Sequence, residues 1–214
     1  MSDILQEIEQ DLRAERLQAL WKNYGKWVIA GAVLIVLATV GFVAWRQWDG
    51  ERHAAQQAEL TAAMQLADQG KLDDASAALA NLSSHAVPIY GVLADFSRAA
   101  LLQAQNKTSD ALVLYDQISE NSRYPDYYRD LGRLFSAWQR ISLEKPDKIE
   151  ARLQPLLLGE HPLRFSAREI LAMSYRLAKD ESTARKLLTA NRDDALAPNA
   201  LRERMGQLLA VAVR

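Results

Sequence analysis

The sequence contains no cysteine, and this absence excludes disulfide bridges and thiolate metal sites. The formal net charge is −1, so there is no basic excess for binding a nucleic-acid backbone. The nucleotide-binding patterns G-x-G-x-x-G and the P-loop are missing, as are the hydrolase patterns G-x-S-x-G and H-E-x-x-H. His53, His85 and His161 have no second ligand at metal-site spacing. We therefore expect a protein that is not an enzyme and has no cofactor, metal, small-molecule substrate or nucleic-acid partner.

What the sequence does contain is one long apolar run. Residues 27–45 are nineteen consecutive positions without a charged side chain. A helix rises about 1.5 Å per residue, so this run is roughly 28 Å long, close to the ~30 Å hydrocarbon core of a bilayer. Trp27 and Trp45 bound the run, where aromatic rings settle at the level of the lipid headgroups. The run predicts one transmembrane helix in a lipid bilayer.

Basic residues around the run predict its orientation. Four precede it and two follow closely, and cytoplasmic flanks carry the excess of Lys and Arg: Arg13, Arg16, Lys22 and Lys26, then Arg46 and Arg52. We expect a single-pass membrane protein with a cytoplasmic N-terminus and its C-terminal domain on the far side of the membrane. The alternative is a cleaved signal peptide, whose apolar region is about 7–15 residues long. The longer run and the poor cleavage site at Phe42-Val-Ala44 before Trp45 favour the retained anchor.

Beyond residue 50 the sequence is rich in Ala, Leu and Gln and predicts helix throughout. A pattern typical of tetratricopeptide repeats recurs at an interval of 36 residues, with small residues at positions 8 and 20 that let two helices approach closely. These positions hold Ala63 and Ala75, Ala99 and Ala111, and Ala172 and Ala184. The tight turn at position 15 holds Gly70, Asn106 and Lys179.

The last interval, from Ala99 to Ala172, is 73 residues, two periods and one residue more. We therefore expect a degenerate unit between them, with helices over residues 130–143 and 148–158. The fold class is all-α: an N-terminal transmembrane helix followed by a tetratricopeptide-like helical repeat solenoid. An irregular helical bundle is the alternative.

The expected organisation has four parts. Residues 1–26 form a cytoplasmic tail with a short amphipathic helix that joins the span at Gly25, and residues 27–45 are the transmembrane helix. Residues 46–57 form a helical stalk. Residues 58–214 form the periplasmic repeat domain, with about four helix pairs and a C-terminal capping helix over residues 199–213.

Besides the tail helix, which has an apolar stripe of Ile4, Leu5, Ile8 and Leu12, two segments are candidates for protein binding. The first lies where the second unit gives way to the degenerate third, and it carries the residue types that dominate interface hot spots: Tyr124, Tyr127, Tyr128, Arg123 and Arg129. The alternative is that these rings pack the junction between the units. The second is a small-residue face on the membrane helix, Gly31, Ala38 and Gly41, which lets another membrane helix approach. Ordinary composition of a span is the alternative there.

The chain resembles the ancillary subunit of the bacterial Sec translocon (the YfgM-like family). The resemblance is carried by Trp21-Lys22-Asn23-Tyr24-Gly25-Lys26 before the span, Trp45-Arg46-Gln47-Trp48 at its end, and a helical repeat domain of this length. It implies a single-pass protein of the bacterial inner membrane, with its N-terminus in the cytoplasm and its repeats in the periplasm. The implied partners are the Sec translocon channel and a membrane-anchored periplasmic chaperone of the prolyl-isomerase type.

The resemblance also implies a function. The chain is expected to assist the hand-over of exported proteins to periplasmic chaperones, without catalytic residues. Two other functions remain open: a structural accessory subunit of another inner-membrane complex, and a soluble periplasmic peptide-binding module released by cleavage.

Overall fold

The computed structural model describes the backbone of residues 2–211, and all side chains within it except those at positions 2–21, 23–25, 28–30, 32 and 211. Every regular element over residues 2–211 is a helix, so the prediction of an all-α chain is confirmed. The helices are α1 (Ser2–Asp68), α2 (Leu72–His85), α3 (Pro88–Ala104), α4 (Thr108–Glu120), α5 (Asp126–Arg140), α6 (Pro146–Leu157), α7 (Arg164–Leu177), α8 (Glu181–Asp193) and α9 (Asn199–Val211).

The chain divides into two compact units, Met1–Ala55 and Gln56–Arg214. The first unit is built from α1, and the last turns of α1 belong to the second. The tail helix was expected to join the span at Gly25, and α1 continues through this residue without a break. An isolated glycine costs a helix only about 1 kcal/mol, so it does not by itself end one. The apolar stripe predicted on the tail lies outside the described side chains.

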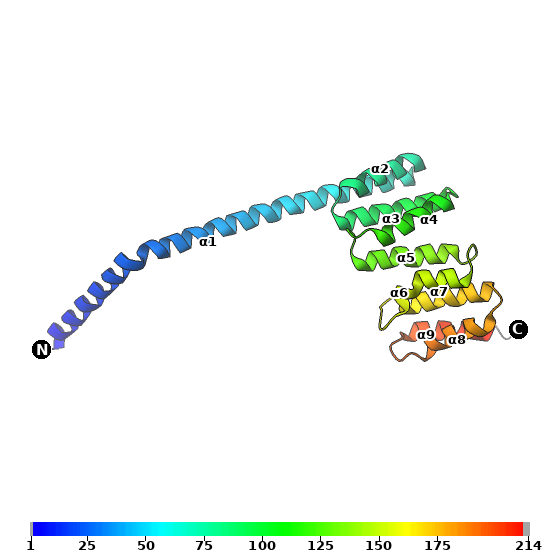
Figure 1. Cartoon of the computed structure of the whole chain (residues 1–214). Helices are drawn as coiled ribbons and strands as arrows, with labels where there is room; N and C mark the ends of the chain where they lie inside the picture. Colours follow the sequence, from blue (N-terminus) through cyan, green and yellow to red (C-terminus); the bar gives the residue numbers. More distant parts are fainter. Residues whose placement is uncertain (1, 212–214) are drawn as a thin grey trace. The chain divides into compact units, whose positions relative to one another are not determined.

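Helices α2 to α9 follow one another in sequence order through the second unit (Figure 1). Each helix packs against its neighbours in the chain, from α2 with α3 to α8 with α9. The alanines predicted at the crossings are buried. Ala63, for example, lies at most 1% exposed beside Leu79 and Leu82, and Ala184 packs with Leu188. A methyl group at these positions lets adjacent helices pack closely, which is why the small residues recur at a fixed interval.

The turns of three helix pairs share one geometry. Position 15 has a positive φ in each: +78° at Gly70, +58° at Asn106 and +65° at Lys179. The next residue donates its backbone N–H to the carbonyl five positions earlier, as Lys107 does to Leu102 at 2.8 Å and Asp180 to Tyr175 at 2.9 Å. This left-handed C-terminal cap satisfies carbonyls that the helix end would leave unpaired. The predicted tight turn is therefore a recurring structural element.

The third pair, α5 and α6, differs from the others. Its turn contains no residue with positive φ, and Pro146 starts α6 after an extended Lys145. Proline restricts the residue before it to extended conformations, so the helix cannot begin earlier. Helix α5 also begins at Asp126 rather than at the expected residue 130. Ser136 is fully buried and precedes Ala172 by one period of 36 residues, so serine takes the place of alanine in this unit.

Helix α9 closes the described part of the second unit. Its residues Met205 and Leu209 are buried against Ala184 and Leu188 of α8. Covering the apolar face of the last pair is the role expected of a terminal helix in a repeat array. The helix is described as far as Val211, and residues 212 and 213, which we expected it to include, lie outside the described residues.

Candidate interaction surfaces

The first candidate surface is the apolar part of α1. Every residue from 33 to 48 is exposed, and Leu34, Ile35 and Leu37 each expose about two thirds of their surface (67%, 66% and 67%). Successive residues of a helix point about 100° apart, so these side chains surround the helix. Over the part of the chain that the structure describes, no helix is long and apolar enough to cross a membrane. The predicted span also includes positions 28–30 and 32, whose side chains lie outside the described ones.

The small-residue face predicted on this helix is open. Gly31, Ala38 and Gly41 are exposed, and a Cβ added at either glycine would have no heavy atom within 4 Å. The face is therefore free for a second helix to approach within the unit described. Its role as a contact stays a prediction.

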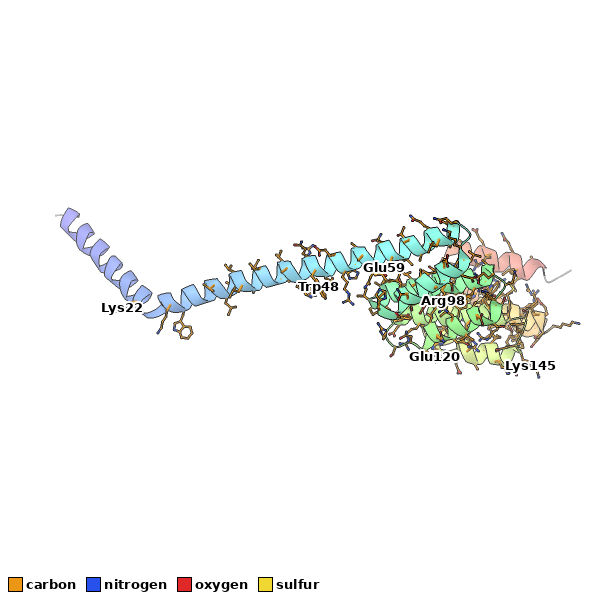
Figure 2. The ribbon with its side chains drawn as sticks, turned by 90° about the horizontal axis from the view of Figure 1, so that it is seen from above. Lys22, Trp48, Glu59, Arg98, Glu120 and Lys145 are labelled. Carbon is orange, nitrogen blue, oxygen red and sulfur yellow. The ribbon has the colours of Figure 1, made fainter. Side chains whose placement is uncertain are left out.

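The C-terminal end of the apolar run carries exposed aromatic rings. The ring of Trp45 lies 6.3 Å from the ring of Phe42, and the guanidinium of Arg52 lies 5.8 Å from the ring of Trp48. Trp45 and Trp48 each expose 59% of their surface. Figure 2 labels Trp48 on α1. An exposed tryptophan beside a cation combines an apolar body with a polar edge, which suits a boundary between apolar and aqueous surroundings.

Tyr124 lies at the junction of the first three helix pairs. Its side chain is only 5% exposed, and its hydroxyl donates to Asp95 Oδ2 at 2.6 Å and lies 3.3 Å from Ser83 Oγ. Burial, together with the hydrogen bond to Asp95, raises the pKa of Tyr124 to about 12. Gly91 makes room for the ring, since a Cβ there would stand 3.3 Å from Tyr124 Cε1. The Tyr124 ring therefore packs the junction between the units, which was the alternative to a binding role.

Of the other residues in the segment 123–129, some pack at the junction and some lie on the surface. Tyr128 is partly buried against the core that contains Tyr124, whereas Tyr127 is 54% exposed and meets the Tyr128 ring edge-on at 5.7 Å. Arg129 pairs with Asp126 at 2.7 Å, and Arg123 donates to the carbonyl of Ala86 at 3.4 Å. Tyr127 is thus the ring of this segment that remains available, and binding of a partner there stays a prediction.

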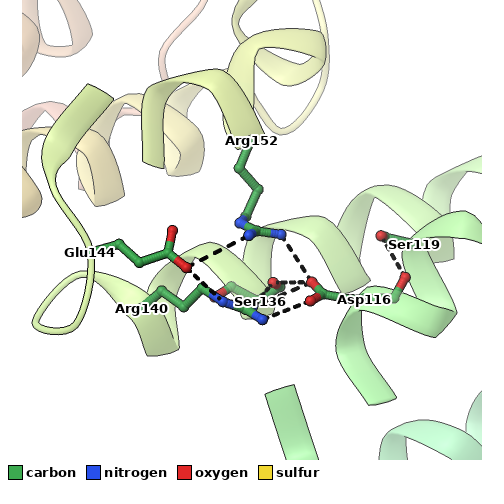
Figure 3. A network of polar contacts seen from close by, with 6 residues as sticks. All are labelled: Asp116, Ser119, Ser136, Arg140, Glu144 and Arg152. Carbon is green, nitrogen blue, oxygen red and sulfur yellow. Dashed lines mark hydrogen bonds and ion pairs between the residues drawn. The ribbon is translucent and has the colours of Figure 1, made fainter. Parts of the chain in front are cut away.

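A polar network joins α4, α5 and α6 (Figure 3). Asp116 Oδ2 accepts from Arg140 at 2.6 Å, and Asp116 Oδ1 accepts from Ser136 at 2.6 Å and from Arg152 at 3.0 Å. Glu144 pairs with Arg140 at 3.1 Å and with Arg152 at 3.9 Å. Two carboxylates and two guanidinium groups balance one another. The network links the irregular third pair to the second, in the unit whose small-residue positions do not match those of the repeat.

A groove between α5 and α7 carries exposed aromatic side chains, and sequence reasoning did not find it. We call it the aromatic groove, and its lining includes Leu134, Phe135, Trp138, Ile170, Glu169 and Arg204. Phe135 stacks on Tyr115 of α4 at 5.6 Å and meets Phe96 of α3 edge-on at 5.8 Å. The sequence does contain one signal for this groove: Phe135 and Trp138 are three residues apart, which places both rings on one face of a helix.

The titratable groups with shifted pKa values have structural partners. The hydrogen bond to Glu150, 2.8 Å long, raises the pKa of Tyr175 to about 12. The hydroxyl and the backbone N–H of Thr183, in the first turn of α8, donate hydrogen bonds to the Asp180 carboxyl. These bonds lower the pKa of Asp180. His161 Nε2 lies 3.0 Å from Asp130 Oδ2, and the backbone N–H of Leu163 donates to His161 Nδ1.

The other two histidines lie apart from His161. His85 is paired with Glu59 at 3.2 Å, and His53 lies 3.6 Å from Asp49. Among the described residues no three His, Asp or Glu side chains are grouped so that they could hold a metal ion. The described polar clusters thus join helices to one another.

Comparison of the chain with models of protein families, with curated proteins and with solved structures finds no match.

Proposed function

We propose that the chain is a non-catalytic, membrane-anchored interaction protein. The observation that carries this proposal is the run of exposed residues from 33 to 48, apolar up to Trp45, on a single helix. Exposed apolar surface of this extent is costly in water and marks a site of contact with lipid or protein. Residues 27–45 contain no charge, which fits a lipid environment better than the surface of a partner that would cover one side.

The second unit supplies the interaction part of the proposal. Its helix pairs, with buried alanines at the crossings and a left-handed turn in three of them, support a tetratricopeptide-like solenoid. Such arrays present extended surfaces that bind other proteins. Tyr127 and the rings of the aromatic groove are exposed, and aromatic side chains of this kind often dominate the binding energy of an interface.

We further propose, from the resemblance, that the partners are the Sec translocon channel and a membrane-anchored periplasmic prolyl-isomerase-type chaperone. The chain would then assist the hand-over of exported proteins, with its N-terminus in the cytoplasm and its repeats in the periplasm. Support comes from Trp21-Lys22-Asn23-Tyr24-Gly25-Lys26 and Trp45-Arg46-Gln47-Trp48. The open face at Gly31, Ala38 and Gly41 offers a contact for a channel helix.

Co-purification from membranes in a mild detergent tests this function. We compare the wild type with the double substitution Gly31→Leu/Ala38→Leu, and the matched control is Val36→Leu/Val43→Leu, which has the same spacing of seven residues. Recovery of the channel and the chaperone with the wild type and the control, and their loss with the first variant, is expected. Recovery of a different inner-membrane complex without translocon subunits would favour the alternative, a structural accessory subunit.

The mass of the mature protein tests the remaining alternative. Cleavage after the apolar run would remove about 5 kDa and release a soluble periplasmic module. We expect the full mass, and the shorter mass would contradict the anchor.

A further inference from the structure

The aromatic groove exposes rings that the fold does not cover. Phe135 is 41% exposed and Trp138 46%, although both stand on a helix whose other side is buried against the core. Phe135 has ring partners in Phe96 and Tyr115. The Trp138 ring, in contrast, forms no ring pair within the described residues. Large side chains exposed together at a hollow mark a binding site more often than a lone exposed residue does.

The size of the groove favours a side chain as its occupant. Its volume is about 270 Å³, and helices α5, α7 and α9 all contribute to its lining. Small-molecule sites usually measure about 300–1,000 Å³ and enclose their ligand, so this groove is small for such a ligand. It has room for one or two bulky side chains of a polypeptide that lies across the helices.

The spacing of the helices favours an extended polypeptide. Packed helices lie about 8–10 Å apart, and an extended chain advances about 3.3 Å per residue. A segment that crosses from α5 towards α7 therefore passes one helix in roughly three residues. Its side chains can then reach Trp138 of α5 and the partly exposed Ser166 of α7, which both line the groove.

The charges of the groove favour an uncharged apolar side chain. Glu169 and Arg204 are the only charged residues of the lining, and they form an ion pair with each other. The pair leaves no net charge to attract an acidic or a basic side chain. A charged group seated beside Trp138 would lose water without gaining an opposite charge, which is unfavourable. The complementary occupant is neutral and apolar.

We propose that the aromatic groove binds an extended, unfolded polypeptide segment through a bulky, uncharged apolar side chain seated beside Trp138. The proposal deepens the proposed function, and rests on it in one respect: the partner is a protein. It names the part of that protein which is recognised. A segment of this kind is exposed in unfolded chains and buried once they have folded.

Fluorescence polarisation with a defined peptide tests the proposal. The probe is a short fluorescein-labelled peptide of Gly, Ser and Asn that carries one Trp, added to the full chain in a mild detergent with the detergent alone as blank. Competing peptides carry Glu or Lys in place of Trp. The variants are Trp138→Ala and the matched control Leu158→Ala, which removes a side chain that is 65% exposed at the end of α6 and outside the groove. Thermal melting followed by circular dichroism confirms that both variants are folded.

We expect Trp138→Ala to weaken binding of the Trp peptide by about tenfold or more, as truncation of an aromatic hot spot does. Leu158→Ala should stay within about twofold of the wild type, and the Glu and Lys peptides should compete poorly. Equal binding by the two variants, or equal competition by the charged peptides, would overturn the proposal. If the chain recovers no membrane complex but binds the Trp peptide through Trp138, the proposed function fails and this inference stands. If it recovers the translocon channel and the chaperone but Trp138→Ala does not weaken binding of the Trp peptide, this inference alone is contradicted.

Discussion

At the scale of single residues, the buried Tyr124 hydroxyl is the clearest case of a polar group that holds elements together. It is the hydrogen-bond donor to Asp95, a carboxylate that is 7% exposed. Tyr124→Phe removes this donor and leaves a buried charge without it, so we expect the free energy of unfolding to fall by about 1–3 kcal/mol. Urea denaturation measures the change, and Tyr127→Phe, at a half-exposed ring, should stay within about 0.5 kcal/mol of the wild type.

The same residue gives a pH prediction. The pKa of Tyr124 is raised to about 12 in the folded state from an ordinary value of 10.0. Above pH 10 the unfolded chain loses this proton while the folded chain keeps it, so the stability that the phenol contributes declines as pH rises to 12. The stability difference between wild type and Tyr124→Phe should therefore shrink across this window. A constant difference across it would contradict the assigned role of the phenol.

Lys179 has a φ of +65°, a left-handed conformation that residues with a Cβ disfavour by roughly 1–2 kcal/mol relative to glycine. We expect Lys179→Gly to raise the melting temperature, because glycine adopts this conformation at little cost. Lys186→Gly, in the interior of α8, should lower it, since glycine costs an exposed helix position about 1 kcal/mol. Two changes of the same sign would contradict this assignment.

At the scale of elements, the polar network decides how the irregular third pair is held. Asp116→Ala removes the carboxylate that Ser136, Arg140 and Arg152 share. We expect a loss of about 1–3 kcal/mol in the free energy of unfolding, less than for a fully buried pair because Asp116 is partly exposed. Gln117→Ala, at the exposed neighbouring position, should have little effect. Chemical denaturation of both variants provides the comparison.

The helix pairs could be predicted from the sequence because their signal is local and repeated. Ala63, Ala99 and Ala172 recur at the interval of the repeat, and Gly70 marks a turn whose geometry the chain then uses again at Lys179. The repeat does not require glycine at the turn, so Asn106 and Lys179 could be aligned by position only.

The third pair could be predicted from the interval between its neighbours, but the contacts that hold it and the aromatic groove could not. Ser136 replaces alanine there, and its hydroxyl is hydrogen-bonded to Asp116 of α4 and to Arg140 of its own helix. The groove needs side chains from α5, α7 and α9 at one place, and no short pattern in the sequence records that proximity. Tyr124 looked like a binding residue because exposed and junction tyrosines have the same local sequence signal.

At the scale of the whole molecule, the absence of native cysteine makes the orientation directly measurable. Single-cysteine variants Ser2→Cys and Ser122→Cys are treated with a membrane-impermeant maleimide after the outer membrane has been opened. The excess of basic residues before the apolar run predicts labelling at position 122 and none at position 2 until the inner membrane is lysed. Labelling at position 2 alone would show the opposite orientation.

The most direct test of the central claim is whether the full chain stays in the membrane during alkaline carbonate extraction. Retention of the wild type in the membrane pellet is expected, because residues 27–45 would be embedded among lipid chains. Leu34→Glu/Leu37→Glu places two charges at the middle of the run, each costing roughly 2.5–3.5 kcal/mol there, and should release the chain into the supernatant. Release of the wild type itself, at full mass, would contradict the membrane anchor.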